Sequence, residues 1–178
     1  ACIIIADKPI FTGVEEILKF SVNQTKNLLQ AELQIKLNEL LEKWFFTSLE
    51  KIFIEQRIYR DIEESESYED VLIAVRTGLE KYVSTPSFRK PTEKLLAKLP
   101  RDITEEDIIK LTEIRIKKIS KYSSFETDKE LESLQEQIAE VNKNLENLIE
   151  FTIDWFKYLK DKYGKGRERK TILTQFEA

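Results

Sequence analysis

The chain has 178 residues, of which 35% are charged, and it carries only four glycines and four prolines. This balance favours long helices, because helix interiors tolerate neither Gly nor Pro. The formal charge of −4 argues against a surface built mainly to hold nucleic acid, and the absence of His excludes imidazole metal sites and every His-based catalytic triad.

Three further sequence features limit where the chain works. The single cysteine, Cys2, excludes an internal disulfide and is typical of a reducing compartment, so we expect a cytoplasmic protein. No apolar run approaches the roughly 20 residues of a membrane span, so no membrane partner is expected. The sequence begins with Ala1 and contains no Met, from which we expect a piece cut from a longer polypeptide.

The first predicted elements are a short hairpin and a long helix. Residues 1–13 hold β-branched residues on one side of the turn Asp7-Lys8-Pro9, which predicts a strand or hairpin belonging to the core of a parent protein. Thr12 to Glu15 has capping-box spacing. Apolar residues then recur at steps of three, four or seven and predict an outgoing coiled-coil helix over 14–44: Ile17, Leu18, Val22, Leu29, Leu33, Leu37, Leu40 and Trp44.

A second long helix is predicted over 127–163. Thr127 to Glu130 has capping-box spacing, and Gly164 is expected to end the helix in the left-handed conformation. The two stretches have similar length and can bury each other if they run antiparallel. Between these ends the seam positions alternate steps of three and four, as in a coiled coil, and all but Thr152 are apolar: Leu131, Leu134, Ile138, Val141, Leu145, Leu148, Thr152, Trp155 and Leu159.

Residues 45–126, between the two seams, predict a small globular head. The apolar stretch 45–60 is expected to form a core helix, a second helix begins near Ser67, and Thr104 to Asp107 caps a later one. A proline-rich segment surrounds a short helix near 95–99, and the tail 164–178 is expected to return to the parent's core as a strand. The predicted fold is mainly α: a long antiparallel coiled-coil arm with a small globular helical head and short terminal β-strands.

Candidate sites are few, and each has a structural alternative. The acidic run 61–70 lacks the Gly and the spacing of a calcium loop, which favours a solvated loop. The basic run 165–170 fits either a phosphate contact or a solvated turn. The aromatic cluster at the start of the head fits either a core or a dimer contact. We predict no catalytic, cofactor-binding or metal-binding residue, and a possible dimer contact through Phe46, Phe53, Ile54 and Tyr59.

Several segments resemble one family in order and spacing. Residues 109–120 (IKLTEIRIKKIS) resemble the apolar-x-x-apolar-Arg-apolar-x-x-apolar-Ser/Thr helix pair of the A subunit of bacterial type IIA DNA topoisomerases, the topoisomerase IV and gyrase pair. Tyr163-Gly164 and the stretch 167–171 resemble the family's Tyr/Phe-Gly-x-x-Arg-x-x-Thr tail. Residues 3–22 resemble the strand–turn–strand that leads into its first long helix. The resemblance covers nearly the whole chain and fits both topoisomerase IV and gyrase.

The resemblance implies a homodimer whose heads meet as the exit gate for a transported DNA duplex. The parent enzyme would be an isomerase that changes DNA topology by ATP-dependent double-strand passage. The B subunit would supply the Mg²⁺ site and the ATPase, and DNA would be a transient partner. The family's DNA-cleaving Tyr lies in an Arg-Tyr-Thr context that this sequence lacks, so the piece itself is expected to be inactive. The alternative is a monomeric coiled-coil adaptor whose head binds another protein.

Overall fold

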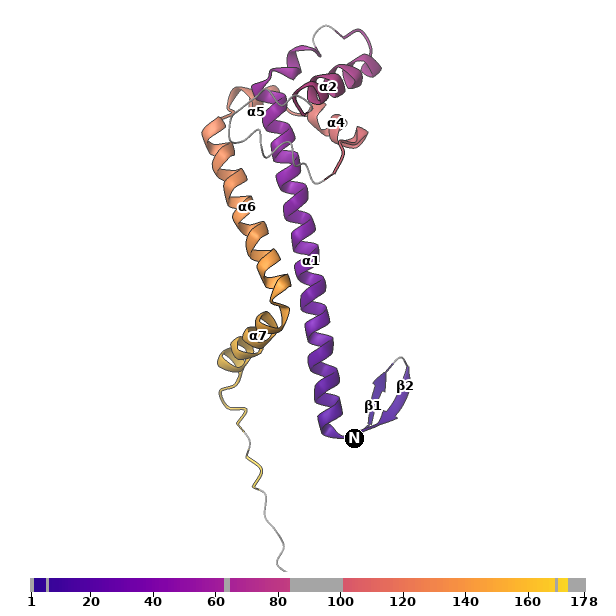
Figure 1. Cartoon of the computed structure of the whole chain (residues 1–178), viewed down its shortest axis with the longest axis vertical. Helices are drawn as coiled ribbons and strands as arrows, with labels where there is room; N and C mark the ends of the chain where they lie inside the picture. The colour runs from indigo at the N-terminus through magenta and orange to yellow at the C-terminus, as the bar shows by residue number, and fades with distance from the viewer. Residues whose placement is uncertain (1, 6, 63–64, 84–100, 169, 173–178) are drawn as a thin grey trace, which may run out of the picture. The chain divides into compact units, whose positions relative to one another are not determined.

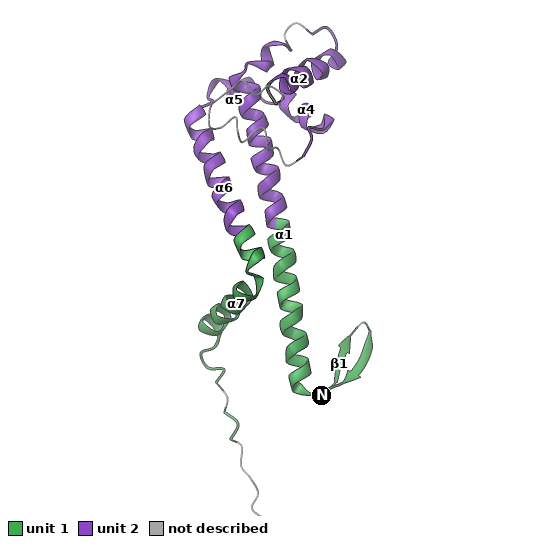
Figure 2. Ribbon diagram, viewed as in Figure 1, with its two compact units in different colours: residues 1–35, 142–178 green, residues 36–141 purple. Residues whose placement is uncertain are grey.

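The computed structural model describes residues 2–5, 7–62, 65–83, 101–168 and 170–172. The chain divides into two compact units (Figure 2). The terminal unit consists of Ala1–Ile35 with Asn142–Ala178, and the central unit of Lys36–Val141. Both are mainly helical, and a short two-stranded sheet lies near the N-terminus, which confirms the mainly α fold with short terminal strands.

The terminal unit begins with the predicted hairpin. Strand β1 (Cys2–Ile5) pairs antiparallel with β2 (Lys8–Phe11), so that Cys2 lies opposite Phe11 and Ile5 opposite Lys8 (Figure 1). Asp7 in the turn has a φ of 61°. An Asp side chain tolerates this left-handed conformation, which explains a two-residue turn without glycine.

Helix α1 (Val14–Glu55) is longer than the sequence predicts. The sequence suggests a helix over 14–44 and a separate core helix from 45, whereas the structure has one helix of 42 residues through both. Neither Gly nor Pro occurs between Val14 and Glu55, so nothing in the backbone stops the helix where its surroundings change. The chain turns just after the helix, where Arg57 has a φ of 57°.

The second long helix is interrupted, contrary to the prediction. Helix α6 (Ser124–Glu146) and helix α7 (Leu148–Tyr163) are separated at Asn147, whose ψ is 42°. The Asn147 side-chain amide donates to the Lys143 carbonyl oxygen at 3.0 Å. Asn side chains can compete with backbone N–H groups for helix carbonyl oxygens in this way, and the spacing of apolar residues does not indicate where this happens.

Two predicted helix ends also differ. Helix α6 begins before Thr127, because the Ser123 hydroxyl accepts the backbone N–H of Glu126 at 3.4 Å. Gly164 is not left-handed: its φ is −75°, and Gly166 instead has a φ of 78°. Glycine at 164 serves close approach, since a Cβ there would lie 2.3 Å from the Lys160 carbonyl oxygen.

The predicted seam is buried only in part. In the central unit α6 lies beside α1, and Trp44 packs with Leu131 and Leu134 (Figure 1). The two segments run antiparallel there, because Lys43 pairs with Glu130 and the later Lys51 with the earlier Asp128. In the terminal unit the buried seam positions are Leu29, Leu33 and Thr152, while Leu18, Val22 and Trp155 are exposed.

The core of the central unit is the predicted head core. It combines the end of α1 with four short elements: η1 (Ile58–Arg60), α2 (Tyr68–Val83), α4 (Glu105–Thr112) and α5 (Ile116–Ser120). Its buried side chains are Phe45, Leu49, Ile52, Phe53, Ile54, Ile58, Val75, Leu79, Ile108 and Leu111. The short helix predicted near 95–99 and most of the predicted C-terminal strand lie outside the described residues.

Candidate functional site

The described part of the chain offers no arrangement for metal catalysis. Within it, no group of three or more His, Cys, Asp or Glu side chains is placed to hold a metal ion. None of the helices it contains has the length and apolarity needed to cross a membrane. The candidate functional features are therefore surfaces and polar contacts, and the central unit contains the best defined of them.

The four predicted dimer-contact residues have different surroundings. Phe53 and Ile54 are buried in the core, with Phe53 only 1% exposed, so they hold the head together. Phe46 and Tyr59 are partly buried against the same core, and the Tyr59 ring meets the Phe53 ring edge-on at 6.3 Å. The structure thus leaves Phe46 and Tyr59 accessible, and the dimer contact itself stays a prediction.

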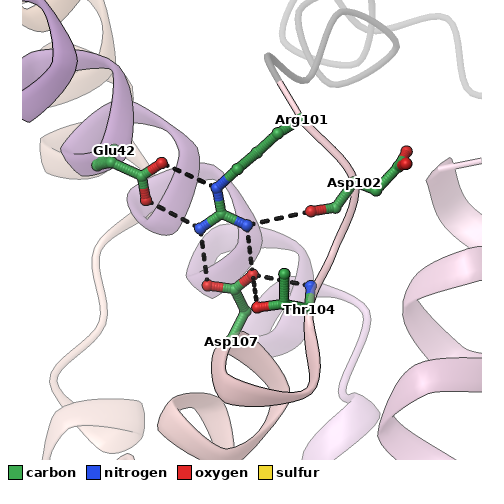
Figure 3. A network of polar contacts seen from close by, with 5 residues as sticks. All are labelled: Glu42, Arg101, Asp102, Thr104 and Asp107. Carbon is green, nitrogen blue, oxygen red and sulfur yellow. Dashed lines mark hydrogen bonds and ion pairs between the residues drawn. The ribbon is translucent and has the colours of Figure 1, made fainter.

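A polar clamp of three charged residues joins α4 to α1 (Figure 3). The Arg101 guanidinium donates two hydrogen bonds of 2.8 Å to the Glu42 carboxylate on α1. It donates two more, of 2.6 and 3.0 Å, to Asp107 in the first turn of α4. The guanidinium also lies 4.1 Å from the centre of the Phe45 ring. The planar fork of Arg suits two bidentate carboxylates at once.

Asp107 is the buried end of the clamp. Its Oδ2 also accepts the backbone N–H and the hydroxyl of Thr104, at 2.9 and 2.8 Å, which confirms the predicted cap of this helix. Its side chain is 3% exposed. Hydrogen bonds from Arg101, and then from Thr104, outweigh the effect of burial and lower the pKa of Asp107 to about 2. Asp107 is therefore ionised near neutral pH.

The pKa values of the other two clamp residues, Glu42 and Arg101, are also shifted so that the charged form is favoured. The hydrogen bonds from Arg101 lower the pKa of Glu42 below its usual value. The hydrogen bonds to Glu42 and Asp107 raise the pKa of Arg101 above its usual value. Each shift favours the charged form, so the clamp is an ion pair network that fixes α4 on α1 within the central unit.

A second polar network joins α1 to the start of α6. The ammonium group of Lys51, whose side chain is 6% exposed, donates to Asp128 and lies 3.6 Å from Glu55. Glu55 Oε1 in turn accepts the hydroxyls of Tyr122 and Ser124, at 3.0 and 2.6 Å. Burial raises the pKa of the Tyr122 phenol above its usual value, so the phenol remains a hydrogen-bond donor.

A groove of about 680 Å³ opens beside this second network. Its lining includes Phe46 and Tyr122, and its charged side chains come from α1, from α5 with the residue on either side of it, and from α6. Two of its carboxylates are neutralised: Glu50 by Lys118 at 2.5 Å, and Glu130 by Lys43 at 2.8 Å. The other charged residues of the lining are Arg115, Lys117, Lys121 and Glu126. The groove therefore carries a net positive charge and contains the predicted contact residue Phe46.

The structure also describes the surroundings of Tyr59 and of most of the basic run. Tyr59, one of the four predicted dimer-contact residues, lies in η1 and packs against the core. In the basic run, Arg167 N–H donates to the Gly164 carbonyl oxygen at 3.0 Å, and Gly166 N–H donates to the Glu168 carboxylate at 3.1 Å. Those contacts form the expected turn. The phosphate contact stays a prediction.

The sequence gives only part of the clamp. The Thr104–Asp107 cap is readable from spacing, whereas Arg101 is separated from its second partner, Glu42, by 59 positions. The sequence feature that could have indicated the Arg101–Asp107 contact is an Arg three residues before a capping box whose acidic residue is Asp. The basic groove had a clearer signal, because four cations fall within residues 115–121 of an acidic chain.

Comparison with known proteins gives one informative match. No family model and no solved structure matches the chain. The chain is similar to the A subunit of DNA topoisomerase 4 from Borreliella burgdorferi, with 26% identity over 166 residues. The match covers 93% of this chain and 24% of that protein, so the chain spans about a quarter of the relative's length. The similarity favours a region of a type IIA topoisomerase A subunit, the family that the sequence motifs resemble.

Proposed function

We propose that the chain is the arm and head of the A subunit of a type IIA DNA topoisomerase. In this proposal two heads meet to form the exit gate through which a transported duplex leaves. The observation that carries the proposal is the similarity along 93% of the chain to the A subunit of one topoisomerase 4. The long helices α1, α6 and α7, with a packed helical core between the first two in sequence, fit an arm and a head.

The role of this region in the parent enzyme is mechanical. The sequence contains no Arg-Tyr-Thr triplet, so the DNA-cleaving Tyr would belong to another part of the A subunit. The Mg²⁺ site and ATP hydrolysis would belong to the B subunit. The clamp of Arg101 with Glu42 and Asp107 supports such a role, because it makes α4 move with α1 when the arm moves.

The test is the association state of this chain in solution. Sedimentation equilibrium between about 1 and 100 µM is expected to show a monomer–dimer equilibrium, since a gate must close and reopen. A chain that remains monomeric throughout this range, while circular dichroism shows it to be folded, would contradict the proposal and favour the monomeric adaptor. The accessible predicted contact residue Phe46 provides the first variant: Phe46→Ser is expected to weaken the dimer, and the exposed α1 variant Leu28→Ser is its control in the terminal unit.

A further inference from the structure

Exposed apolar side chains of the central unit gather near two charged surfaces. Among its described residues, the large hydrophobic side chains that are exposed are Tyr68, Ile73, Ile116 and Phe125. Tyr68 and Ile73 lie on α2, Ile116 begins α5, and Phe125 is in the first turn of α6. Apolar side chains surrounded by charge are the usual composition of a protein–protein contact, with an apolar centre and a polar rim.

The first surface is the basic face, which we define as Arg115, Lys117, Lys118 and Lys121 around Ile116. Ile116 is 83% exposed. Lys118 is neutralised by Glu50, whereas Arg115, Lys117 and Lys121 have no carboxylate within 4 Å among the described residues. These residues form one side of the groove that also contains Phe46 and Tyr122. The face thus offers three cations without a paired carboxylate, beside a groove that contains the aromatic rings of Phe46 and Tyr122.

The second surface is the acidic face, which we define as Asp61, Glu66, Glu69 and Asp70 beside Tyr68 and Ile73. A shallow hollow of about 390 Å³ is lined by Asp61, Glu66, Asp70 and Ile73. None of the four carboxylates has a Lys or Arg partner within 4 Å in the part of the chain that the structure describes. Ile73 is 62% and Tyr68 59% exposed. The acidic face is therefore opposite in charge to the basic face, and like the basic face it carries exposed apolar side chains.

We propose that the basic face of one copy binds the acidic face of a second copy, so that a two-fold dimer contains this contact twice. The proposal rests on the homodimer of the proposed function and names the surfaces that form it. A two-fold interface requires that each copy contribute both sides of the contact, which these two faces on one chain supply. Opposite charges at the rim favour the correct partner and orientation, and burial of Ile116, Ile73 and Tyr68 provides the attraction that salt does not screen.

A second copy fits these surfaces better than nucleic acid does. Besides its cations the groove contains the carboxylate of Glu126, which has no Lys or Arg partner within 4 Å among the described residues and would oppose a phosphate backbone. An exposed Ile116 and the half-buried Phe46 add nothing to a phosphate contact but suit an apolar side chain of a protein. Three surplus cations also give only a small electrostatic footprint on DNA.

A charge-swap experiment on the whole chain tests the proposal. The first variant reverses the basic face with Arg115→Glu, Lys117→Glu and Lys121→Glu. The second reverses the acidic face with Asp61→Lys, Glu66→Lys and Glu69→Lys. Asp70 is left unchanged, because its carboxylate accepts the Ser67 hydroxyl at 2.6 Å at the start of α2. Dimerisation is measured by sedimentation equilibrium at about 50 mM salt, and the fold of each variant by circular dichroism.

Each variant alone is expected to dimerise at least 30-fold more weakly than the wild type, since both of its faces then carry one sign. An equimolar mixture is expected to restore a dimer, because one chain is acidic on both faces and the other basic on both. The matched control for the first variant reverses the exposed Lys8, Lys165 and Lys170 of the terminal unit to Glu, which lowers the net charge by the same amount as that variant. This control is expected to dimerise within about three-fold of the wild type.

The outcomes separate this inference from the proposed function. A wild-type dimer that persists unchanged in both variants overturns the two faces and leaves the exit gate standing. A wild type that is monomeric overturns both. If the control weakens the dimer as much as the basic-face variant does, the change in net charge explains the effect, and the inference is also overturned. Fluorescence anisotropy with a labelled 20-base-pair duplex gives the last alternative: DNA binding that is lost on reversal of the basic face, with the dimer intact, assigns that face to nucleic acid.

Discussion

The sharpest stability prediction concerns Asp107. The substitution Asp107→Asn keeps the shape of the side chain but removes the charge and one of the two oxygens that together accept four hydrogen bonds from Arg101 and Thr104. Breaking a buried ion pair costs about 3–5 kcal/mol. Since Arg101 is 32% exposed and keeps Glu42, we expect a cost of about 2–3 kcal/mol for the variant.

The lowered pKa of Asp107 reflects the same hydrogen bonds and gives a similar magnitude. A fall from 3.8 to about 2 corresponds to about 2 kcal/mol of stability in favour of the ionised form. Because the native state lowers this pKa, the contribution is complete above about pH 4 and is lost as the pH falls through about 2. Between these two values the wild type is expected to lose stability more steeply than Asp107→Asn, which has no carboxylate to protonate there.

Tryptophan fluorescence during urea unfolding measures both effects. The chain has two tryptophans, so Trp155→Phe in every variant leaves Trp44, buried in the central unit, as the reporter. A cost of about 2–3 kcal/mol moves the midpoint by roughly 1–2 M urea at neutral pH. Glu106→Gln, an exposed acid in the same first turn, is the control and is expected to cost less than about 0.5 kcal/mol. A cost for Asp107→Asn no larger than this control would refute the reasoning.

Two further pairs of substitutions test close packing and the second polar network by the same urea titration. Gly78→Ala places a Cβ 2.8 Å from Cγ2 of the buried Ile58, so the substitution is expected to cost about 1 kcal/mol despite the better helix propensity of Ala. The control Gly13→Ala places a Cβ with nothing within 4 Å and is expected to be neutral. Equal effects of the two substitutions would contradict the close packing at Gly78. Lys51→Met is expected to stay within about 1 kcal/mol of the wild type, because it removes the buried charge itself. Asp128→Ala is expected to cost more, because it leaves the buried ammonium with only the more distant carboxylate of Glu55. The opposite order would show that the Lys51 ammonium is solvated.

The sequence predicts this fold where local chemistry decides it. The hairpin at 2–11, the cap at Thr104 and the apolar residues of the head core all follow from spacing and turn chemistry, and the structure has them. The continuation of α1 past Trp44 was missed, since the change from seam to core looks like a boundary in the sequence although no helix-breaking residue occurs there.

The remaining differences come from interactions that periodicity does not record. The break at Asn147 depends on a side-chain amide reaching the carbonyl four residues earlier. After Thr152 the predicted seam continues to Trp155, whereas the half-buried positions are Phe156 and Leu159. The buried and half-buried positions Leu148, Thr152 and Phe156 follow each other at two successive steps of four, whereas a heptad pattern alternates steps of three and four. Residues near a helix break need not keep that alternation. The clamp required a partner 59 positions away, which spacing alone cannot identify.

One last prediction separates an electrostatic contact between heads from a purely apolar one. Glu50, whose side chain is 12% exposed, neutralises Lys118 of the basic face at 2.5 Å. Glu50→Gln frees that cation and raises the surplus on the face from three to four, so the substitution is expected to tighten the dimer about two- to five-fold at low salt. Glu39→Gln, an exposed acid on α1 outside the groove, is the control and is expected to change nothing. Most interface substitutions weaken binding, so a gain that disappears at 0.5 M salt has no ready explanation other than added charge. A dimer that weakens in Glu50→Gln would instead mean that Glu50 matters for holding Lys118 and α5 in place, and that the basic face does not attract its partner through its net charge.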